Sequence, residues 1–283
     1  MPSQPAHSGL FPAVDSEPAA SPAATRAYGV IADRIYRTLG DHAYPLDVYR
    51  PHAEDKGSTR PAVVVVHGQA RPALLRDAKS WPALRRLARG LAGRDVVAVV
   101  PNLGASASGP EPWRQYSNVG LVADNVVAAV RHVQAHAVTL GVDRRRIGLW
   151  IASEGGLYAL GPALGGELNG AVRGAVAVHP RLWDARLALT RPALDAGLLA
   201  RLRSADHVRR GPEAFPILIV RAALDASDVN GPIDAFAHLA AQAQAPVTVV
   251  RHEGGHHAFD GVEATDEAAS ALDRALAFLE RNL

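Results

Sequence analysis

Short apolar stretches recur along the chain, and most of them are followed directly by a proline or a polar residue. They are residues 62–66 (AVVVV), 96–100 (VVAVV), 147–152 (IGLWIA), 174–178 (GAVAV), 217–222 (ILIVRA) and 247–250 (VTVV). An unbroken run of β-branched residues is typical of a strand buried on both faces, as in a parallel sheet covered by helices. The pattern therefore predicts a series of buried parallel strands.

The segments between these strands change to helical spacing. Leu84, Leu87 and Leu91 lie on one face of a helix that Gly93 should end. A valine stripe predicts a second helix over 119–137, which Ser117 or Asn118 can cap. Further helices are expected over 155–164, 233–245 and 266–283.

Two extended stretches precede the first buried strand. Residues 30–40 and 44–51 flank a short turn, which predicts an antiparallel hairpin. The fold class is therefore α/β: a mostly parallel, doubly wound sheet with this hairpin at its N-terminal edge and helices on both faces. Chemistry in such a sheet gathers at the carboxyl ends of its strands.

Composition distinguishes two parts of the chain. Residues 1–28 are rich in proline, alanine and serine and predict a flexible leader. Residues 29–283 are expected to form a single domain, with a short helical insert near 181–214 that leaves the site fairly open. The leader lacks a basic start and an apolar segment, so we expect no secretory signal and a cytoplasmic location.

Charge and residue usage exclude several kinds of function. The chain has no cysteine, which excludes disulfides, thiolate catalysis and cysteine-ligated zinc. Its net charge is only +2, its basic residues are scattered and its aromatic content is 5%, so no nucleic-acid partner is expected. No apolar run reaches the ~18 residues that a membrane span needs. The oligomeric state stays open.

A serine, an acid and a histidine follow successive strands in that order. Ser153 follows the strand that ends at Ala152, and the sequence ALDASD after the next-to-last strand supplies Asp225 or Asp228. The loop after the last strand contains the pair His256–His257. Strand ends meet at one edge of a parallel sheet, so these side chains can converge into a nucleophile, base and orienting carboxylate.

The turn around Ser153 also suits this chemistry. A sharp strand–serine–helix turn exposes the hydroxyl and aims the next backbone N–H, that of Glu154, at a developing oxyanion. A second N–H is expected from the loop after the first buried strand, at Gln69. The alternative is that Ser153 merely caps the helix that follows.

These motifs together resemble the α/β-hydrolase superfamily, and within it the dienelactone-hydrolase-like branch of small esterases. The stretches that carry the resemblance are PLDVYRP, VVVVHGQ, RRIGLWIASEGG, FPILIVRAALD with NGPIDAF, and HHAFD, within residues 30–283. The resemblance implies the α/β-hydrolase fold, a serine hydrolase acting on an ester or lactone, and the catalytic residues Ser153, Asp225 and His257. Two positions depart from the family pattern: Ile151 replaces the first glycine of the serine turn, and Ala223 replaces a glycine before the acid.

Several alternatives remain. Ile151 could prevent the turn from forming, which would leave a non-catalytic binding protein, and the same three residues could instead cleave a peptide or thioester. His67, Trp113, Tyr116 and Phe259 are candidates for lining the substrate pocket, although core packing explains them equally well. The expected partner is a small-molecule substrate; no cofactor is required and no metal is expected, because the histidine pair has no second group of ligands nearby.

Overall fold

The computed structural model describes residues 27–52, 58–70, 72–105, 116–168, 170–184, 187, 194–208 and 215–283. The expected leader lies outside these ranges except for its last residues, and Tyr28 already belongs to the first strand. The strands are β1 (Tyr28–Leu39), β2 (His42–Pro51), β3 (Arg60–Val66), β4 (Val97–Pro101), β5 (Val142–Ala152), β6 (Val172–Val178), β7 (Ile217–Ala222) and β8 (Val247–His252).

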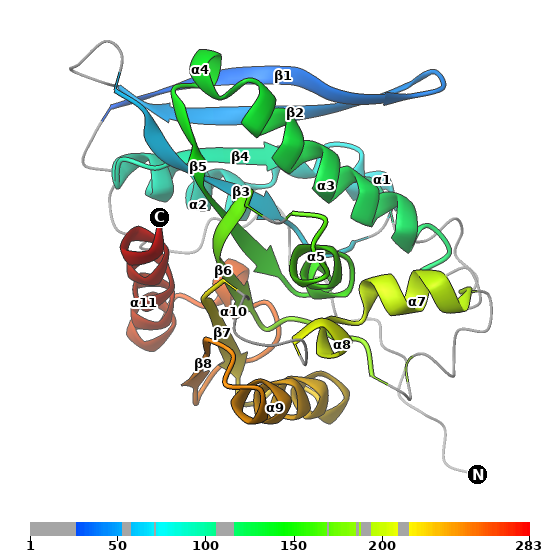
Figure 1. Cartoon of the computed structure of the whole chain (residues 1–283). Coiled ribbons are helices and arrows are strands. Elements are labelled where there is room, and N and C mark those ends of the chain that lie inside the picture. Colours follow the sequence, from blue (N-terminus) through cyan, green and yellow to red (C-terminus); the bar gives the residue numbers. More distant parts are fainter. Residues whose placement is uncertain are drawn as a thin grey trace.

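These strands form one sheet in the order β1-β2-β4-β3-β5-β6-β7-β8 (Figure 1). The strands β3 to β8 run parallel to their neighbours, whereas β2 is antiparallel to both β1 and β4. The expected mostly parallel sheet with an antiparallel hairpin at its N-terminal edge is therefore confirmed.

Helices cover both faces of the sheet. They are α1 (Pro72–Leu75), the short 3₁₀ turn η1 (Ala78–Ser80), α2 (Pro82–Gly93), α3 (Val119–Ala135), α4 (Ala137–Leu140), α5 (Gly155–Leu164), α7 (Ala196–Leu202), α8 (Ser204–Val208), α9 (Ser227–Gln242), α10 (Phe259–Val262) and α11 (Asp266–Asn282). The helices α3, α5 and α9 pack on one face, and α2 and α11 pack on the other.

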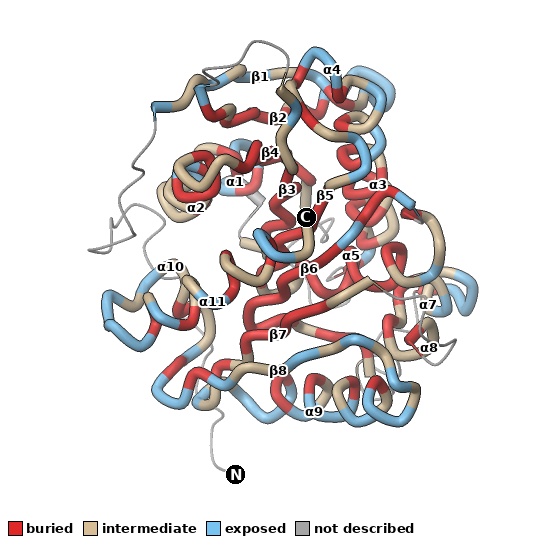
Figure 2. Tube along the Cα trace, turned by 60° about the vertical axis from the view of Figure 1, so that its left-hand side comes forward, coloured by how far each residue is buried: buried red, intermediate tan, exposed pale blue. Residues whose placement is uncertain are grey.

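Alternation along the central strands feeds both hydrophobic cores. On β3, Val64 and Val66 point into the core beneath α3 and α5, while Val63 and Val65 point toward α2 and α11. All four side chains are fully buried, as the valine run predicts. Figure 2 shows the same result as a buried centre within a partly exposed layer of helices.

One helix cap and the start of one helix differ from the prediction. Asn118 occupies the position before α3, but its side chain makes no capping hydrogen bond. The helix α9 begins at Ser227 rather than at residue 233, so Pro232 lies inside the helix. The loop that carries the acid is consequently short.

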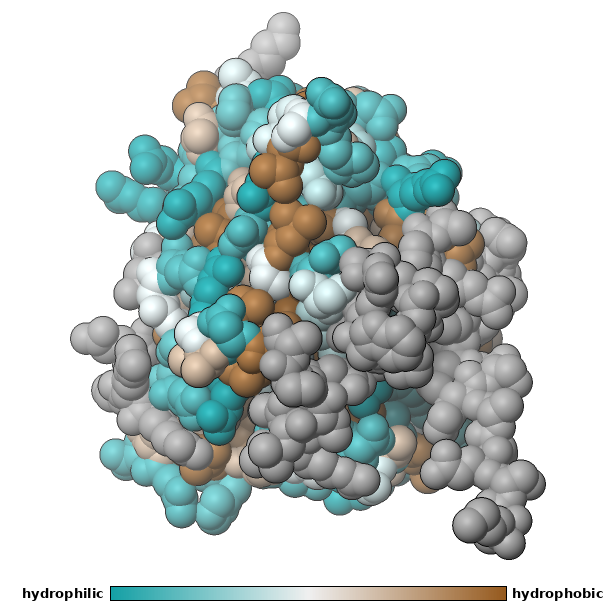
Figure 3. All heavy atoms as spheres, turned by 90° about the vertical axis from the view of Figure 1, so that its right-hand side faces the viewer, coloured by the Kyte–Doolittle hydropathy of each residue, from teal (hydrophilic) through white to brown (hydrophobic). Residues whose placement is uncertain are grey.

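The described part of residues 181–214 contains the two small helices α7 and α8. Asp195 caps α7 by accepting a hydrogen bond from the backbone N–H of Leu198. Figure 3 shows one face of the molecule, where hydrophobic residues are exposed near the centre with hydrophilic residues above and beside them.

Candidate active site

Ser153 lies in a strained turn between β5 and α5. Its φ is +50°, a left-handed conformation that costs a non-glycine residue of order 1–3 kcal/mol. Its backbone N–H donates to the carbonyl of Val178, and its own carbonyl accepts from Gly156 and Arg181. Glu154, not Ser153, occupies the capping position of α5, and no side chain makes the cap hydrogen bond there. These contacts fix the turn and give no support to the capping alternative.

Ile151 does not prevent this turn from forming. Its side chain is fully buried in the core beneath α3 and α5, and its backbone pairs with Val66 and Ala177 in the neighbouring strands. The space it needs comes from Gly155: a Cβ at Gly155 would lie 3.1 Å from Cγ2 of Ile151 and 2.9 Å from the carbonyl oxygen of Val66. Gly155, four positions after Ile151, thus leaves the space that the Ile151 side chain needs in place of the glycine of the family pattern.

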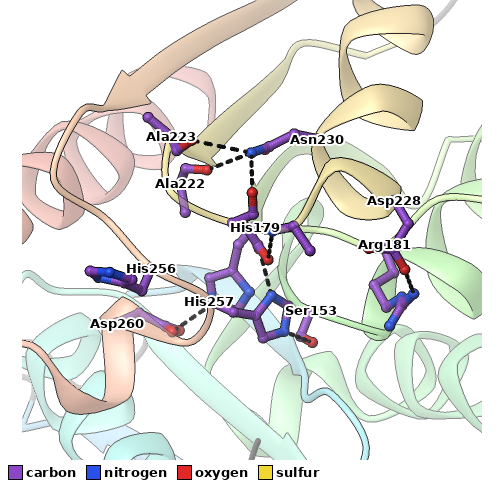
Figure 4. A network of polar contacts seen from close by, with 12 residues as sticks. Ser153, His179, Arg181, Ala222, Ala223, Asp228, Asn230, His256, His257 and Asp260 are labelled. Carbon is purple, nitrogen blue, oxygen red and sulfur yellow. Dashed lines mark hydrogen bonds and ion pairs between the residues drawn. The ribbon is translucent and has the colours of Figure 1, made fainter. Parts of the chain in front are cut away.

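Three side chains from distant parts of the chain form a hydrogen-bonded row (Figure 4). Ser153 Oγ lies 2.7 Å from Nε2 of His257. Nδ1 of the same ring lies 2.6 Å from Oδ2 of Asp225. The carboxylate can only accept at neutral pH, so Nδ1 carries the proton and Nε2 is left to accept from the serine hydroxyl.

The environment keeps Asp225 ionised. Its side chain is 5% exposed, and burial alone would raise its pKa, but the hydrogen bond and charge of His257 outweigh burial and hold the pKa below its ordinary value. The backbone N–H of Ala226 also donates to its Oδ1 over 2.7 Å. This carboxylate is therefore a charged acceptor behind the imidazole.

The two rival residues face elsewhere. Asp228 lies in the first turn of α9 and binds Arg181 at 2.8 Å. His256 is exposed, and its backbone N–H and ring contact Glu263. In Figure 4 its side chain lies away from Ser153.

The loop after β3 runs directly against Ser153. A Cβ at Gly68 would lie 2.9 Å from Cβ of Ser153 and 3.4 Å from its Oγ, so only glycine lets the loop come this close. Gln69 follows, and its side-chain amide lies 3.4 Å from the hydroxyl of Tyr158. The backbone of Gln69 and that of Glu154 thus flank the serine from two elements.

The pocket candidates lie mostly in the interior. His67 is 1% exposed, its Nδ1 lies 2.7 Å from the carbonyl oxygen of Gly68, and its ring packs on Trp81. Burial lowers the pKa of His67 to about 4. Phe259 is fully buried against two histidine rings, and Trp113 lies outside the described residues.

Tyr116 is the candidate with a direct link to the serine turn. It is 1% exposed, and its hydroxyl donates to Oε1 of Glu154 over 2.9 Å. Its ring packs edge-on against Trp183, and its φ is +67°. The side chain of Glu154 is thus held by Tyr116.

Sequence reasoning missed Asn230 and His179, two residues around this row. Asn230 donates from Nδ2 to the backbone carbonyl oxygens of Ala222 and Asp225, each at 3.0 Å, and so holds the acid loop. His179 and Asp260 form a second pair beside His257, at 2.7 Å. The position of His179 directly after β6 was a usable signal, because it also lies at a carboxyl strand end.

Among the described residues, no group of three or more histidine, aspartate or glutamate side chains is arranged to hold a metal ion. None of the helices in the described part of the chain combines the length and apolar character that crossing a membrane requires.

Comparison with solved structures identifies the architecture. The Est2 esterase of the planctomycete Thermogutta terrifontis superposes with a TM-score of 0.69 at 22% identity, covering 89% of this chain and 92% of that one. A brefeldin A esterase, a bacterial homologue of human hormone-sensitive lipase, gives 0.66 at 20% identity over 95% and 81%. A Klebsiella pneumoniae protein named as a dienelactone hydrolase gives 0.66 at 21% identity over 90% and 99%.

The Thermogutta esterase also has a solved form phosphorylated by paraoxon, which matches with a TM-score of 0.65 at 21% identity and covers 89% of this chain and 92% of that one. No protein-family model and no curated protein matches the sequence. The likenesses confirm the expected α/β-hydrolase fold.

Proposed function

We propose that the protein is a serine hydrolase that cleaves a carboxylic ester or lactone of a small to medium substrate through an acyl-enzyme. The observation that carries this proposal is the continuous row from Ser153 Oγ through His257 to Asp225, with contacts of 2.7 Å and 2.6 Å. A serine hydroxyl is a weak nucleophile unless an adjacent base takes its proton, and this row supplies both the base and its orienting carboxylate.

The reaction runs in two halves. Ser153 Oγ attacks the carbonyl carbon while its proton passes to Nε2 of His257, and the backbone N–H groups of Gln69 and Glu154 stabilise the oxyanion. His257 then protonates the departing alkoxide, which leaves an acyl group on Ser153. Water, deprotonated by the same imidazole, attacks the acyl carbon and releases the acid and the free serine.

The substrate class is supported by the solved relatives. Proteins named as esterases and as a dienelactone hydrolase share this fold, and one of these esterases reacts with the organophosphate paraoxon. We therefore infer a small-molecule ester as the substrate. The cytoplasmic location expected from the sequence stays a prediction.

Hydrolysis of p-nitrophenyl esters of increasing acyl length, together with a lactone, a thioester and a peptide anilide, tests the proposal. We expect ester or lactone turnover that falls on the order of a thousandfold or more in Ser153→Ala, with unchanged thermal unfolding. Turnover confined to the thioester or the anilide would move the function to another class of bond. A folded wild-type protein inert toward every substrate would point to binding without catalysis.

A further inference from the structure

The ring of a second histidine, His179, packs against the ring of His257. His179, at the end of β6, is 2% exposed, and its ring centroid lies 4.6 Å from that of His257 at an interplanar angle of 61°. Its φ is +38°, a conformation that non-glycine residues rarely adopt, and its backbone N–H donates to the carbonyl of Val220 over 2.7 Å. The fold thus holds this ring against the imidazole of the candidate base.

Asp260 fixes the second ring. Its Oδ1 lies 2.7 Å from Nε2 of His179, and it stands three positions after His257, in the first turn of α10. Burial acts to raise the pKa of Asp260, but the interactions with His179 outweigh it and the pKa lies below its ordinary value. The group is therefore a carboxylate at neutral pH.

The hydrogen-bond pattern decides where the proton of His179 lies. Nδ1 of His179 is buried and has no hydrogen-bond partner among the described residues. A proton on Nδ1 would be a buried donor without an acceptor, whereas a proton on Nε2 is donated to the carboxylate of Asp260.

We propose that His179 and Asp260 are positioning residues, a second imidazole–carboxylate pair that supports His257 through the contact between the two histidine rings. The ring of His179 limits rotation of His257, so that Nε2 stays aimed at Ser153. The charge of Asp260 adds to that of Asp225 and stabilises the imidazolium. This inference rests on the proposed function for its kinetic part.

The charges around His257 come from several elements. Asp225 lies before α9, and Ser153 lies at the β5 turn. Asp260 on α10 lies beyond His179, and the guanidinium of Arg86 on α2 lies 3.5 Å from the backbone carbonyl oxygen of Asp260. Removing the charge of Asp260 therefore leaves the carboxylate of Asp225 in place and changes only one of the charges near His257.

The test compares Asp260→Asn, which removes the charge but keeps size and shape, with His179→Ala, which removes the ring against His257 but keeps the charge of Asp260. Asp234→Asn is the matched control, because Asp234 is an exposed carboxylate paired with Arg221. The titration of His257 is followed by NMR on protein with ¹⁵N-labelled histidine. A charge separated from a titrating group by about the width of one imidazole ring shifts the midpoint of that group by about half to one pH unit.

We expect Asp260→Asn to lower the titration midpoint of His257 by that amount and to move the acid limb of kcat/KM to lower pH, whereas the His179 variant keeps the Asp260 carboxylate and should leave the midpoint near the wild-type value. Both variants should lower kcat about tenfold with KM within about twofold, and the control should change none of these. A wild-type midpoint in folded Asp260→Asn, or a wild-type kcat in either folded variant, would overturn the inference. The NMR titration needs no turnover, so a protein that cleaves no ester would refute the proposed function while the coupling is still measured.

Discussion

Ile151 and Gly155 should be energetically coupled, because one supplies the space that the other fills. A Cβ at Gly155 would meet Ile151 Cγ2 at 3.1 Å and the carbonyl oxygen of Val66 at 2.9 Å, so Gly155→Ala overpacks the site. Overpacking of this kind costs about 1–3 kcal/mol of unfolding free energy. Ile151 is fully buried, so Ile151→Ala should cost about 2–5 kcal/mol.

The double variant should be more stable than the two single costs predict when added. Ile151→Ala removes Cγ2, which relieves the side-chain part of the clash, while the contact with the backbone of Val66 remains. We therefore expect a coupling free energy of roughly 1 kcal/mol, at the lower end of the range for residues in contact.

Urea unfolding, followed by tryptophan fluorescence and by circular dichroism, measures this cycle. Serine reactivity toward a fluorophosphonate, expressed per folded molecule, should stay within a few-fold of wild type in Ile151→Ala, because this side chain packs in the core beneath α3 and α5. Strict additivity of the two costs would refute the compensation between these positions. A gain of reactivity on removing the isoleucine would show that it does hinder the turn.

The remaining predictions concern the acid, the base and pH. Asp225→Asn should lower kcat on the order of a thousandfold, because it removes the charge and no longer fixes the tautomer of His257. Asp228→Asn should stay near the wild-type kcat. Equal losses of kcat in the two variants would contradict the assignment of Asp225. Likewise, His257→Ala should abolish turnover of a p-nitrophenyl ester and His256→Ala should not. His67 is buried with a pKa of about 4, so the unfolded chain binds its proton first as pH falls below about 6.5. Stability should therefore decrease by roughly 3 kcal/mol between pH 6.5 and 4. In His67→Gln, the free energy of unfolding measured with urea should lack this decrease between about pH 6.5 and 4. A pH dependence equal to that of the wild type would contradict the prediction.

The sheet could be predicted from the sequence because each strand is a short apolar run. The valines of β3 and β4 leave no polar face, so a strand covered on both sides is the only arrangement that buries them. The order of serine, acid and histidine could be predicted for the same reason, since carboxyl strand ends share one edge.

The choice within each pair of neighbours depended on geometry that the sequence does not contain. Whether Asp225 or Asp228 faces the histidine is decided by the start of α9 at Ser227, which puts Asp228 on the helix and leaves Asp225 in the loop. Gly231 and Pro232, two residues that disfavour a helix, lie inside α9. The role of Gly155 in accommodating Ile151 was equally hidden, because it is a contact between a strand and a helix.

His179 was missed because its partner lies 81 positions away. A histidine after a buried strand carries no sign of which carboxylate it will meet. Only the short helix α10, which sequence periodicity cannot detect, brings Asp260 to it.

The most direct test of the central claim is covalent capture of the nucleophile. Wild-type protein is treated with a fluorophosphonate, and the adduct is located by peptide mass spectrometry, with Ser153→Ala and His257→Ala as parallel samples. The account predicts a single adduct, on Ser153, that is absent in the first variant and strongly slowed in the second. A folded protein that stays unlabelled, or that is labelled equally in all three samples, would contradict it.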